Sequence, residues 1–473
     1  MRKKSFILAA IASFLAFSSI PSYAAKPIDV LVIDSGSDFT HKELKAMANP
    51  NLAELNGKAN VDDDKNGYAD DVYGWNYVEN NSTIVNLKDT PPDYDKVISV
   101  MRDINKMQQY GQMAFSRQEW MNFMMNYNNP AIKPWVSFCG GWAHGTHCTG
   151  IIASNNKNIS FKAIRHIPTG KAPNKVVEDS FTRLKYKIAH RTKKTKMTME
   201  ELEGYFDQLG KENIAEIKPQ ADYIAKFNPR LVNCSFGTEN ANVVNYVRQN
   251  LAEWGMQNVP SEDIQKIANL FVKKAMFPRD KVFYGGLKNA LIFIAAGNSR
   301  ENMDNITTSP QSFPMDNKIV IAATNDNQRI ADFSCYGKNS VDVAVPGVNI
   351  YATYPNQKMG YMSGTSMACP NALGMASLVL TENPDLTPVQ LKKILMDTVD
   401  KKDWLKERVK SGGVINVDRA VYAAKLMKTG KSLTEAVKEA KDKVADKDVK
   451  KDHKVGCDLS DPVVKSIYFN NVY

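Results

Sequence analysis

Short apolar runs, separated by longer segments with helical spacing, are the feature that most limits how this chain can fold. Residues 30–33 and 291–296 are apolar throughout, and residues 318–323 read as a further strand. Strands without polar side chains are buried on both faces. Strands that alternate with helices form a parallel sheet with helices on both sides. We therefore expect an α/β fold of three layers, a mostly parallel sheet between two layers of helices.

Asp34 directly follows the first of these runs and precedes a Ser-Gly turn. It therefore lies at the carboxyl end of the expected strand. Ligands and catalytic groups gather at this edge of an open α/β sheet. Taken alone, an aspartate at a strand end is more often a residue that caps a turn.

Ser366 lies in a motif that favours nucleophilic chemistry, the sequence Gly-Thr-Ser-Met-Ala-Cys-Pro of residues 364–370. The apolar, helix-forming residues that follow predict that Ser366 lies at a helix N-terminus, where free backbone N–H groups favour negative charge. A serine hydroxyl needs a base to become a nucleophile. The alternative is a serine that only caps the helix.

Two histidines, His144 and His147, are candidates for that base, and they precede the apolar residues 151–153. Asp34, His144 and Ser366 then occur in one of the three chain orders that build an aspartate–histidine–serine triad. A lone histidine is more often a structural residue, so His147 and His41 are interpreted as structural.

Five segments of the chain resemble, in the same order, the sequence boxes of subtilisin-like serine proteases (subtilases). They are the aspartate box at residues 34–36, the histidine box at 144–147, the cleft strand at 233–237, the oxyanion segment at 295–298 and the serine box at 364–368. The resemblance extends over residues 27–425. It implies that family's fold, a three-layer, mostly parallel twisted sheet with the triad at its carboxyl edge.

The resemblance also implies a role for each site residue. Ser366 attacks the scissile carbonyl, His144 is the general base, and Asp34 orients His144. Asn298 and the backbone N–H of Ser366 form the oxyanion hole. The choice of His144 over His147 rests on the resemblance alone. The walls of the substrate pocket are assigned in the same way to Ser235, Phe236, Gly237 and Gly297.

These assignments predict a serine endopeptidase that hydrolyses peptide bonds through an acyl-enzyme intermediate. One alternative is a catalytically silent binding protein on the same fold, which the intact set of site residues argues against. Another is an acyl hydrolase with the same triad. Esterases carry glycine two residues after the nucleophile, and Ala368 occupies that position here.

The N-terminus predicts an exported protein, secreted or periplasmic. Residues 1–24 combine a basic start, an apolar stretch over residues 6–17 and a small-residue cleavage site after Ala24, as in a signal peptide. The apolar stretch is too short to span a membrane, so we expect no stable membrane anchor.

The formal charge of +10 is mild for 473 residues. We expect protein or peptide substrates, no nucleic acid partner and a monomer.

The sequence suggests three parts. Residues 1–24 form the signal peptide, residues 25–425 the peptidase domain with insertions at about 49–143 and 176–228, and residues 426–473 a charged C-terminal tail. Subtilases usually carry an inhibitory prodomain before the catalytic domain. Only nine residues, 25–33, separate the expected cleavage site from Asp34. We therefore expect no autocatalytic N-terminal processing.

An acidic segment makes structural calcium a candidate ligand, although the chemistry itself requires no cofactor. Asp62, Asp64 and Asn66, followed by Gly67, resemble the start of a calcium-binding loop. The glutamate expected at the twelfth position is replaced by Tyr73. The alternative is an acidic surface turn that binds no metal.

The chain has six cysteines, which an exported protein can pair as disulfides. Cys148, Cys234 and Cys369 lie within the motifs and are expected to be small buried side chains. Cys139, Cys335 and Cys457 remain open to pairing.

Overall fold

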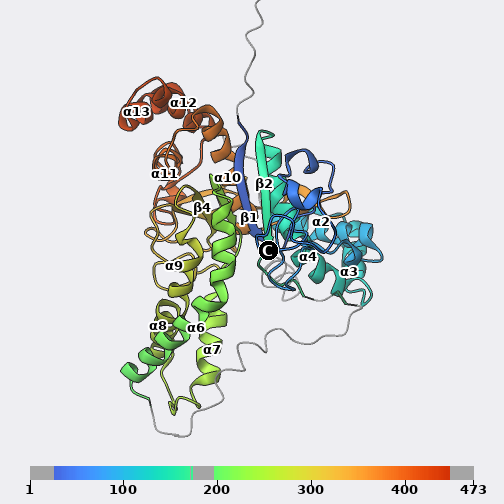
Figure 1. Cartoon of the computed structure of the whole chain (residues 1–473), viewed down its shortest axis with the longest axis vertical. Coiled ribbons are helices and arrows are strands. Elements are labelled where there is room, and N and C mark those ends of the chain that lie inside the picture. Colours follow the sequence, from blue (N-terminus) through green and yellow to red (C-terminus); the bar gives the residue numbers. More distant parts are fainter. Residues whose placement is uncertain (1–25, 171, 174–196, 327, 448–473) are drawn as a thin grey trace, which may run out of the picture.

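A nine-stranded sheet forms the centre of the computed structural model, which describes residues 26–170, 172–173, 197–326 and 328–447 (Figure 1). Eight strands follow the order β10-β11-β7-β5-β4-β3-β1-β2, and β6 pairs with β5 beside this path. Neighbours from β2 to β11 are parallel, whereas β6 and β10 pair antiparallel. The strands are β1 (Ile28–Asp34), β2 (Ile159–Arg165), β3 (Leu231–Cys234), β4 (Leu291–Ala295), β5 (Lys318–Asn325), β6 (Arg329–Ile330), β7 (Val343–Pro346), β10 (Asp400–Lys401) and β11 (Gly413–Val414).

Helices cover both faces of this sheet, which confirms the expected three-layer α/β fold. Strand β1 shows the arrangement residue by residue. Val30 and Val32 pack into one core with α10 (Thr365–Glu382), whereas Leu31 and Ile33 pack into the opposite core with α6 (Met199–Lys226) and α9 (Phe277–Gly285). Because alternate side chains of a strand point to opposite faces, an apolar run is needed to fill both cores.

The first face also carries the C-terminal helices, which are α11 (Pro388–Asp397), α12 (Val417–Lys428) and α13 (Leu433–Lys443). The expected domain boundary at residue 426 falls inside α12. Helix α13 packs against α12 and buries Ala436 and Ala440. Arg419 forms ion pairs with Asp400 and Asp446, and these tie the same region to the sheet edge. Residues 433–443 of the expected tail are therefore a packed helix.

The residues between β1 and β2 form a helical layer beside the sheet. Helices α2 (Tyr94–Tyr110), α3 (Arg117–Tyr127) and α4 (Lys133–Asn155) pack against the hairpin β8 (Ile350–Tyr354) and β9 (Lys358–Met362). The short helix α1 (Leu52–Leu55) precedes them in the chain. Helix α4 carries His144 and begins at Lys133. It therefore includes residues 133–143 of the expected insertion, because Pro134 suits its first turn and Val136 is buried against α2 and α3.

A second helical region extends from the sheet and has a core of its own. Helix α6 spans 28 residues and runs beside α7 (Asn240–Asn250), α8 (Ser261–Phe271) and the π-helical turn η4 (Val272–Met276) (Figure 1). Phe206 and Trp254 pack with Phe271 in this core. Residues 197–226 of the expected insertion are therefore largely helical. Residues 174–196 and the expected signal peptide lie outside the described residues.

Short 3₁₀ turns complete the described secondary structure: η1 (Lys45–Met47), η2 (Leu87–Asp89), η3 (Gln112–Ala114) and η5 (Asp403–Leu405). The five described cysteines are buried free thiols. This confirms the expectation for Cys148, Cys234 and Cys369. It also shows that Cys139 and Cys335, which the sequence left open to pairing, form no disulfide with each other. Cys457 lies outside the described residues.

Candidate active site

Asp34 lies where the sheet changes direction. Strand β1 pairs with β2 on one side and with β3 on the other, so the next two strands along the chain lie on opposite sides of β1. Such a switch point opens a crevice at the carboxyl edge, where ligands bind in α/β proteins. Strands β3 and β4 are parallel to β1, so the segments that follow them begin at the same edge.

Asp34 and His144 form a direct pair at this edge. The Nδ1 atom of His144 lies 2.7 Å from Asp34 Oδ1, and the same oxygen accepts a hydrogen bond of 2.7 Å from the Ser35 N–H. Gly145 lets α4 approach the strand end, because a Cβ atom there would lie 2.3 Å from the Gly36 carbonyl oxygen. Both members of the pair are buried.

The carboxylate of Asp34 controls the charge of His144. Burial alone would disfavour the imidazolium and lower the pKa of His144. The negative charge of Asp34 and the hydrogen bond to it outweigh that effect, so the pKa of His144 is raised well above its ordinary value. Asp34 therefore stabilises the imidazolium that forms whenever His144 takes up a proton.

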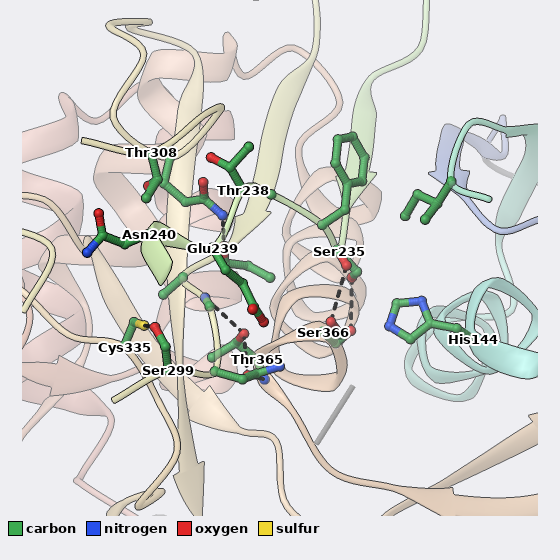
Figure 2. A pocket seen from close by; sticks show the side chains of 18 of the residues that line it. His144, Ser235, Thr238, Glu239, Asn240, Ser299, Thr308, Cys335, Thr365 and Ser366 are labelled. Atoms are coloured by element: carbon green, nitrogen blue, oxygen red, sulfur yellow. Dashed lines mark hydrogen bonds between the residues drawn. The ribbon is translucent and has the colours of Figure 1, made fainter. Parts of the chain in front are cut away.

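Ser366 lies in the first turn of α10 and is held against the segment after β3. Its Oγ donates a hydrogen bond of 3.1 Å to the Ser235 carbonyl, and Ser235 Oγ donates one of 2.9 Å to the Ser366 carbonyl (Figure 2). The hydroxyl is therefore bonded to Ser235 rather than to His144 in this structure. Catalytic hydrogen bonds are often long or unformed before substrate binds. Transfer of the Ser366 proton to His144 requires the hydroxyl to leave Ser235.

Asn298 is fixed beside the serine by the neighbouring threonine. Its Oδ1 accepts hydrogen bonds of 2.9 Å from both the backbone N–H and the Oγ1 of Thr365. Thr365 Oγ1 also accepts from the Gly297 N–H at 3.1 Å. Gly297 has φ of 109°, a conformation that suits glycine. These contacts turn the oxygen end of the Asn298 amide toward Thr365 and fix its orientation.

One cavity of about 270 Å³ brings the sequence-predicted residues together. Its lining includes all eight of them: Asp34, His144, Ser235, Phe236, Gly237, Gly297, Asn298 and Ser366. Figure 2 shows Ser366 between His144 and the more distant pocket side chains Thr308 and Asn240. A substrate in this cavity can contact the serine and the histidine at once.

Other lining residues were not identified from the sequence. Thr365 lies inside the serine box, but its link to Asn298 joins residues 67 positions apart and has no local signal. Cys148 is not part of the lining, but it follows His144 by one helical turn, and its Sγ lies 3.9 Å from His144 Nδ1. Glu301 and Gln311 reach the cavity from the segment after β4. That segment has no motif that marks it as a pocket wall.

His147 and His41 bond to backbone carbonyls outside this cavity, which agrees with their structural interpretation. His147 Nε2 donates to the carbonyls of Ile350 and Gly360, at 3.1 and 3.2 Å. Burial lowers the pKa of His147 to about 3, so its ring is neutral. His41 Nε2 donates to the Lys358 carbonyl at 3.1 Å. Both histidines therefore connect their segments to the β8–β9 hairpin.

The acidic segment of residues 62–71 folds so that several carboxylate groups lie close together. Oxygens of Glu54, Asp62 and Asp64 lie within 4.8 Å of one another. Glu54 reaches the loop from α1, and its Oε1 accepts from the backbone N–H groups of Asp63 and Asp64, at 2.8 and 3.1 Å. Burial raises the pKa of Asp71, which accepts a hydrogen bond of 2.7 Å from Tyr223. The donor set is made of hard oxygens, the kind that calcium prefers.

Together, the fold and the cavity define a class. A parallel α/β sheet carries an aspartate–histidine pair and a buried serine at its carboxyl edge, which is the side-chain set of a serine hydrolase. Residues 26–424 match the family model described as the subtilase family. The chain therefore belongs to the subtilase family.

Individual relatives are similar at moderate identity. Subtilisin-like protease 1 of Plasmodium berghei (strain Anka) is 26% identical over 411 residues, which are 86% of this chain and 51% of that protein. The cell wall-associated protease of Bacillus subtilis (strain 168) is 40% identical over 114 residues, 24% of this chain and 12% of that protein. The chain spans about half the length, or less, of the curated relatives it matches.

Among solved structures, a cold-adapted subtilisin-like serine proteinase matches with a TM-score of 0.42 and 18% identity. The match covers 82% of this chain and 86% of that chain. None of the helices in the described ranges is long and apolar enough to cross a membrane.

Proposed function

We propose that this protein is a serine endopeptidase in which Ser366, His144 and Asp34 act as the catalytic triad. The observation that carries this proposal is the buried 2.7 Å hydrogen bond between His144 Nδ1 and Asp34 Oδ1, in a cavity also lined by Ser366. The bond fixes the histidine tautomer, so that Nε2 is the atom that accepts a proton. Membership of the subtilase family supports the same activity.

The reaction begins when Ser366 Oγ attacks the scissile carbonyl carbon and gives its proton to His144 Nε2. The carbonyl oxygen becomes an oxyanion, and Asp34 stabilises the new imidazolium. Collapse of the tetrahedral intermediate breaks the C–N bond, and His144 returns the proton to the leaving amine. Water then attacks the acyl-enzyme by the same route, with His144 taking the water proton and Ser366 leaving as the alcohol.

In this proposal, Asn298 and the first turn of α10 donate hydrogen bonds to the oxyanion. The oxygen end of the Asn298 amide is bonded to Thr365, and the amide nitrogen is at the opposite end. The Ser366 N–H belongs to a first turn, where backbone donors lack partners within the helix. Loss of one oxyanion donor costs about 2.7–4 kcal/mol of barrier in enzymes of this type.

Cleavage of a protein substrate tests the function. We expect the purified full chain to cleave an unfolded protein at internal peptide bonds, and the Ser366→Ala variant to lose that cleavage. Peptide and ester substrates are compared in the same assay. Hydrolysis of esters without peptide cleavage would identify an acyl hydrolase instead. A folded protein that cleaves neither would be a silent binding protein.

We also propose that the protein is exported, that its signal peptide ends at Ala24, and that it acts as a monomer on proteins or peptides. The basic start and the apolar stretch over residues 6–17 support export. N-terminal sequencing of the exported protein should give a chain that starts at Ala25. A start beyond residue 36 would remove Asp34 and contradict both the cleavage site and the triad.

We propose that the loop with Glu54, Asp62 and Asp64 binds a structural calcium ion. Their clustered carboxylate oxygens support it, and Glu54 supplies an acidic ligand that position 73 lacks. At calcium concentrations about 100 times Kd, the free energy of unfolding should rise by about 2.7 kcal/mol over the value in chelator. The Asp64→Asn variant should lose this increment, whereas Asp222→Asn, in a surface ion pair with Lys218, should keep it. Equal stability with calcium and with chelator would contradict the proposal.

A further inference from the structure

The cavity that contains Ser366 has a second part whose side chains the triad does not use. This part is lined by Glu239, Asn240, Glu301, Thr308 and Gln311. In Figure 2, Glu239, Asn240 and Thr308 lie on the side of Ser366 away from His144. A hydrogen bond of 2.8 Å from the Thr238 N–H to the Ser309 carbonyl connects the two segments that form this wall.

Two buried polar atoms on this wall lack partners within the described part of the chain: Thr308 Oγ1 and Gln311 Oε1. The two residues are 2% and 5% exposed. Gln311 Nε2 donates to the Ala295 carbonyl at 3.0 Å, which fixes the amide and identifies Oε1 as the acceptor without a partner. Buried polar groups are nearly always hydrogen-bonded. A ligand with hydrogen-bond donors would suit this wall, because the Gln311 carbonyl oxygen can only accept and the Thr308 hydroxyl can accept or donate.

The same part of the cavity carries negative charge. Glu301 Oε1 accepts from Asn240 Nδ2 at 2.9 Å, and Glu301 Oε2 accepts from Ser299 Oγ at 2.6 Å. These neutral donors orient the carboxylate without cancelling its charge. Glu239 adds a second, exposed carboxylate. Among the residues that the structure describes, no lysine or arginine lines the cavity, and none forms an ion pair with either glutamate.

We propose that this part of the cavity is a specificity pocket for lysine or arginine on the amino side of the cleaved bond (P1). The inference rests on the proposed function, because the pocket matters only if Ser366 attacks a peptide carbonyl. The P1 side chain is attached next to that carbonyl and must therefore enter the space beside Ser366. Glu301 is the main specificity-determining residue, with Glu239, Thr308 and Gln311 as further polar contacts.

Charge and hydrogen bonding favour a basic side chain over the alternatives. Lysine has three hydrogen-bond donors and arginine has five. Both side chains are positively charged and can pair with Glu301 and Glu239. An apolar P1 side chain would leave Thr308 Oγ1 and Gln311 Oε1 buried and unpaired. An acidic side chain would be repelled by the two carboxylates.

The test is a set of peptides that differ only at P1, with lysine, arginine, methionine, glutamine or glutamate in that position. The active fraction of the full chain is first titrated with a fluorophosphonate. We expect kcat/KM for lysine or arginine to exceed that for methionine about 10-fold or more, with glutamate lowest. This ratio should fall as salt is added, because ions screen the glutamates. A ratio near one, or a preference for methionine, would overturn the inference.

The Glu301→Gln variant removes the charge and keeps the size of the side chain. We expect its lysine-to-methionine ratio to fall about 5-fold or more. The matched control is Glu407→Gln, because Glu407 is exposed and pairs with Lys338 at 2.8 Å outside the cavity. The control should keep the wild-type ratio. An unchanged ratio in Glu301→Gln would overturn the role of Glu301.

The outcomes distinguish a failure of the basic specificity pocket from a failure of the proposed endopeptidase activity. Labelling of Ser366 together with cleavage after neutral residues would overturn the basic pocket and leave the endopeptidase intact. Neither labelling nor cleavage in folded protein would overturn both.

Discussion

At the scale of single residues, the charge on His144 decides when the site can act. The base must be neutral to accept the proton of Ser366. Burial opposes a charge on this ring, but the Asp34 carboxylate at 2.7 Å outweighs burial and raises the pKa of His144. The free protein therefore holds His144 protonated up to a pH above the ordinary range of histidine. Activity should appear only on the alkaline side of that pH.

The Asp34→Asn variant tests this dependence. In the wild type, kcat/KM should rise with pH along a limb whose midpoint lies above 6.5, the ordinary pKa of histidine. Removing the negative charge should move the midpoint down and lower kcat by about 10⁴, because an asparagine amide can donate to Nδ1 and hold the wrong histidine tautomer. A pH–rate profile on a reactive peptide ester measures both effects. The same midpoint in both proteins would show that Asp34 does not set this pKa.

Individual site residues differ in how far they can be predicted from the sequence. Asp34, His144 and Ser366 each stand in a short motif with a local physical reason, a strand end or a helix start. Thr308 and Gln311 have no such motif, and they become pocket residues only because the segments after β3 and β4 meet. The bond from the Ser366 hydroxyl to Ser235 likewise depends on two segments 131 residues apart.

At the scale of elements, the distance between α4 and the end of β1 positions the aspartate–histidine pair. Gly145 allows this close approach because it has no side chain. A Cβ atom at this position would lie 2.3 Å from the Gly36 carbonyl oxygen and 3.1 Å from Asp34 Cβ. Backbone cannot move aside as a flexible side chain can. A larger residue must therefore push the helix away from the strand and separate Asp34 from His144.

The Gly145→Ala variant should destabilise the fold by about 1–3 kcal/mol and lower kcat/KM by more than the stability loss explains. Gly204→Ala is the control, because Gly204 lies within α6 and its added Cβ would meet nothing within 4 Å. The control should be more stable by about 0.5–1 kcal/mol. Urea unfolding and peptide hydrolysis measure the two effects. Wild-type activity in Gly145→Ala would contradict the proposed role of this helix approach.

The elements themselves were predictable where one local signal dominates. The apolar runs at β1 and β4 and the Thr387-Pro388 start of α11 have such signals, and the structure has a capping box at Thr387. The start of α4 was not predicted, because residues 133–143 pack on α2 and α3 rather than on the sheet. The β8–β9 hairpin was not predicted either. Its strands are paired with each other and bound by His147 and His41, which no local pattern reveals.

At the scale of the whole molecule, buried neutral histidines connect stability to pH. Burial lowers the pKa of His147 to about 3 and that of His166 to about 4. Unfolded histidines take up protons below about pH 6.5, but these two do so only at much lower pH when folded. The unfolded state then binds more protons, so stability falls as the pH drops from 6.5 toward 4. The raised pKa of His144 contributes a slope of the opposite sign near pH 6.5, and none well below it, where that residue is protonated in both states.

The His147→Gln variant isolates one contribution. Glutamine can place an amide N–H near the carbonyls of Ile350 and Gly360, but it does not titrate. The slope of unfolding free energy against pH should therefore fall by up to about 1.4 kcal/mol per pH unit between pH 6 and 4. Denaturant unfolding at a series of pH values gives this slope. An identical slope in wild type and variant would contradict a neutral buried His147.

The central claim is that Ser366 is the nucleophile of a triad with His144 and Asp34, and labelling tests it most directly. The full chain is treated with a fluorophosphonate, and the adduct is located by mass spectrometry of its peptides. We predict one adduct, on Ser366, which forms faster as the pH rises and fails to form in His144→Ala. No adduct in protein that unfolds cooperatively, or an adduct on another serine, would contradict the account.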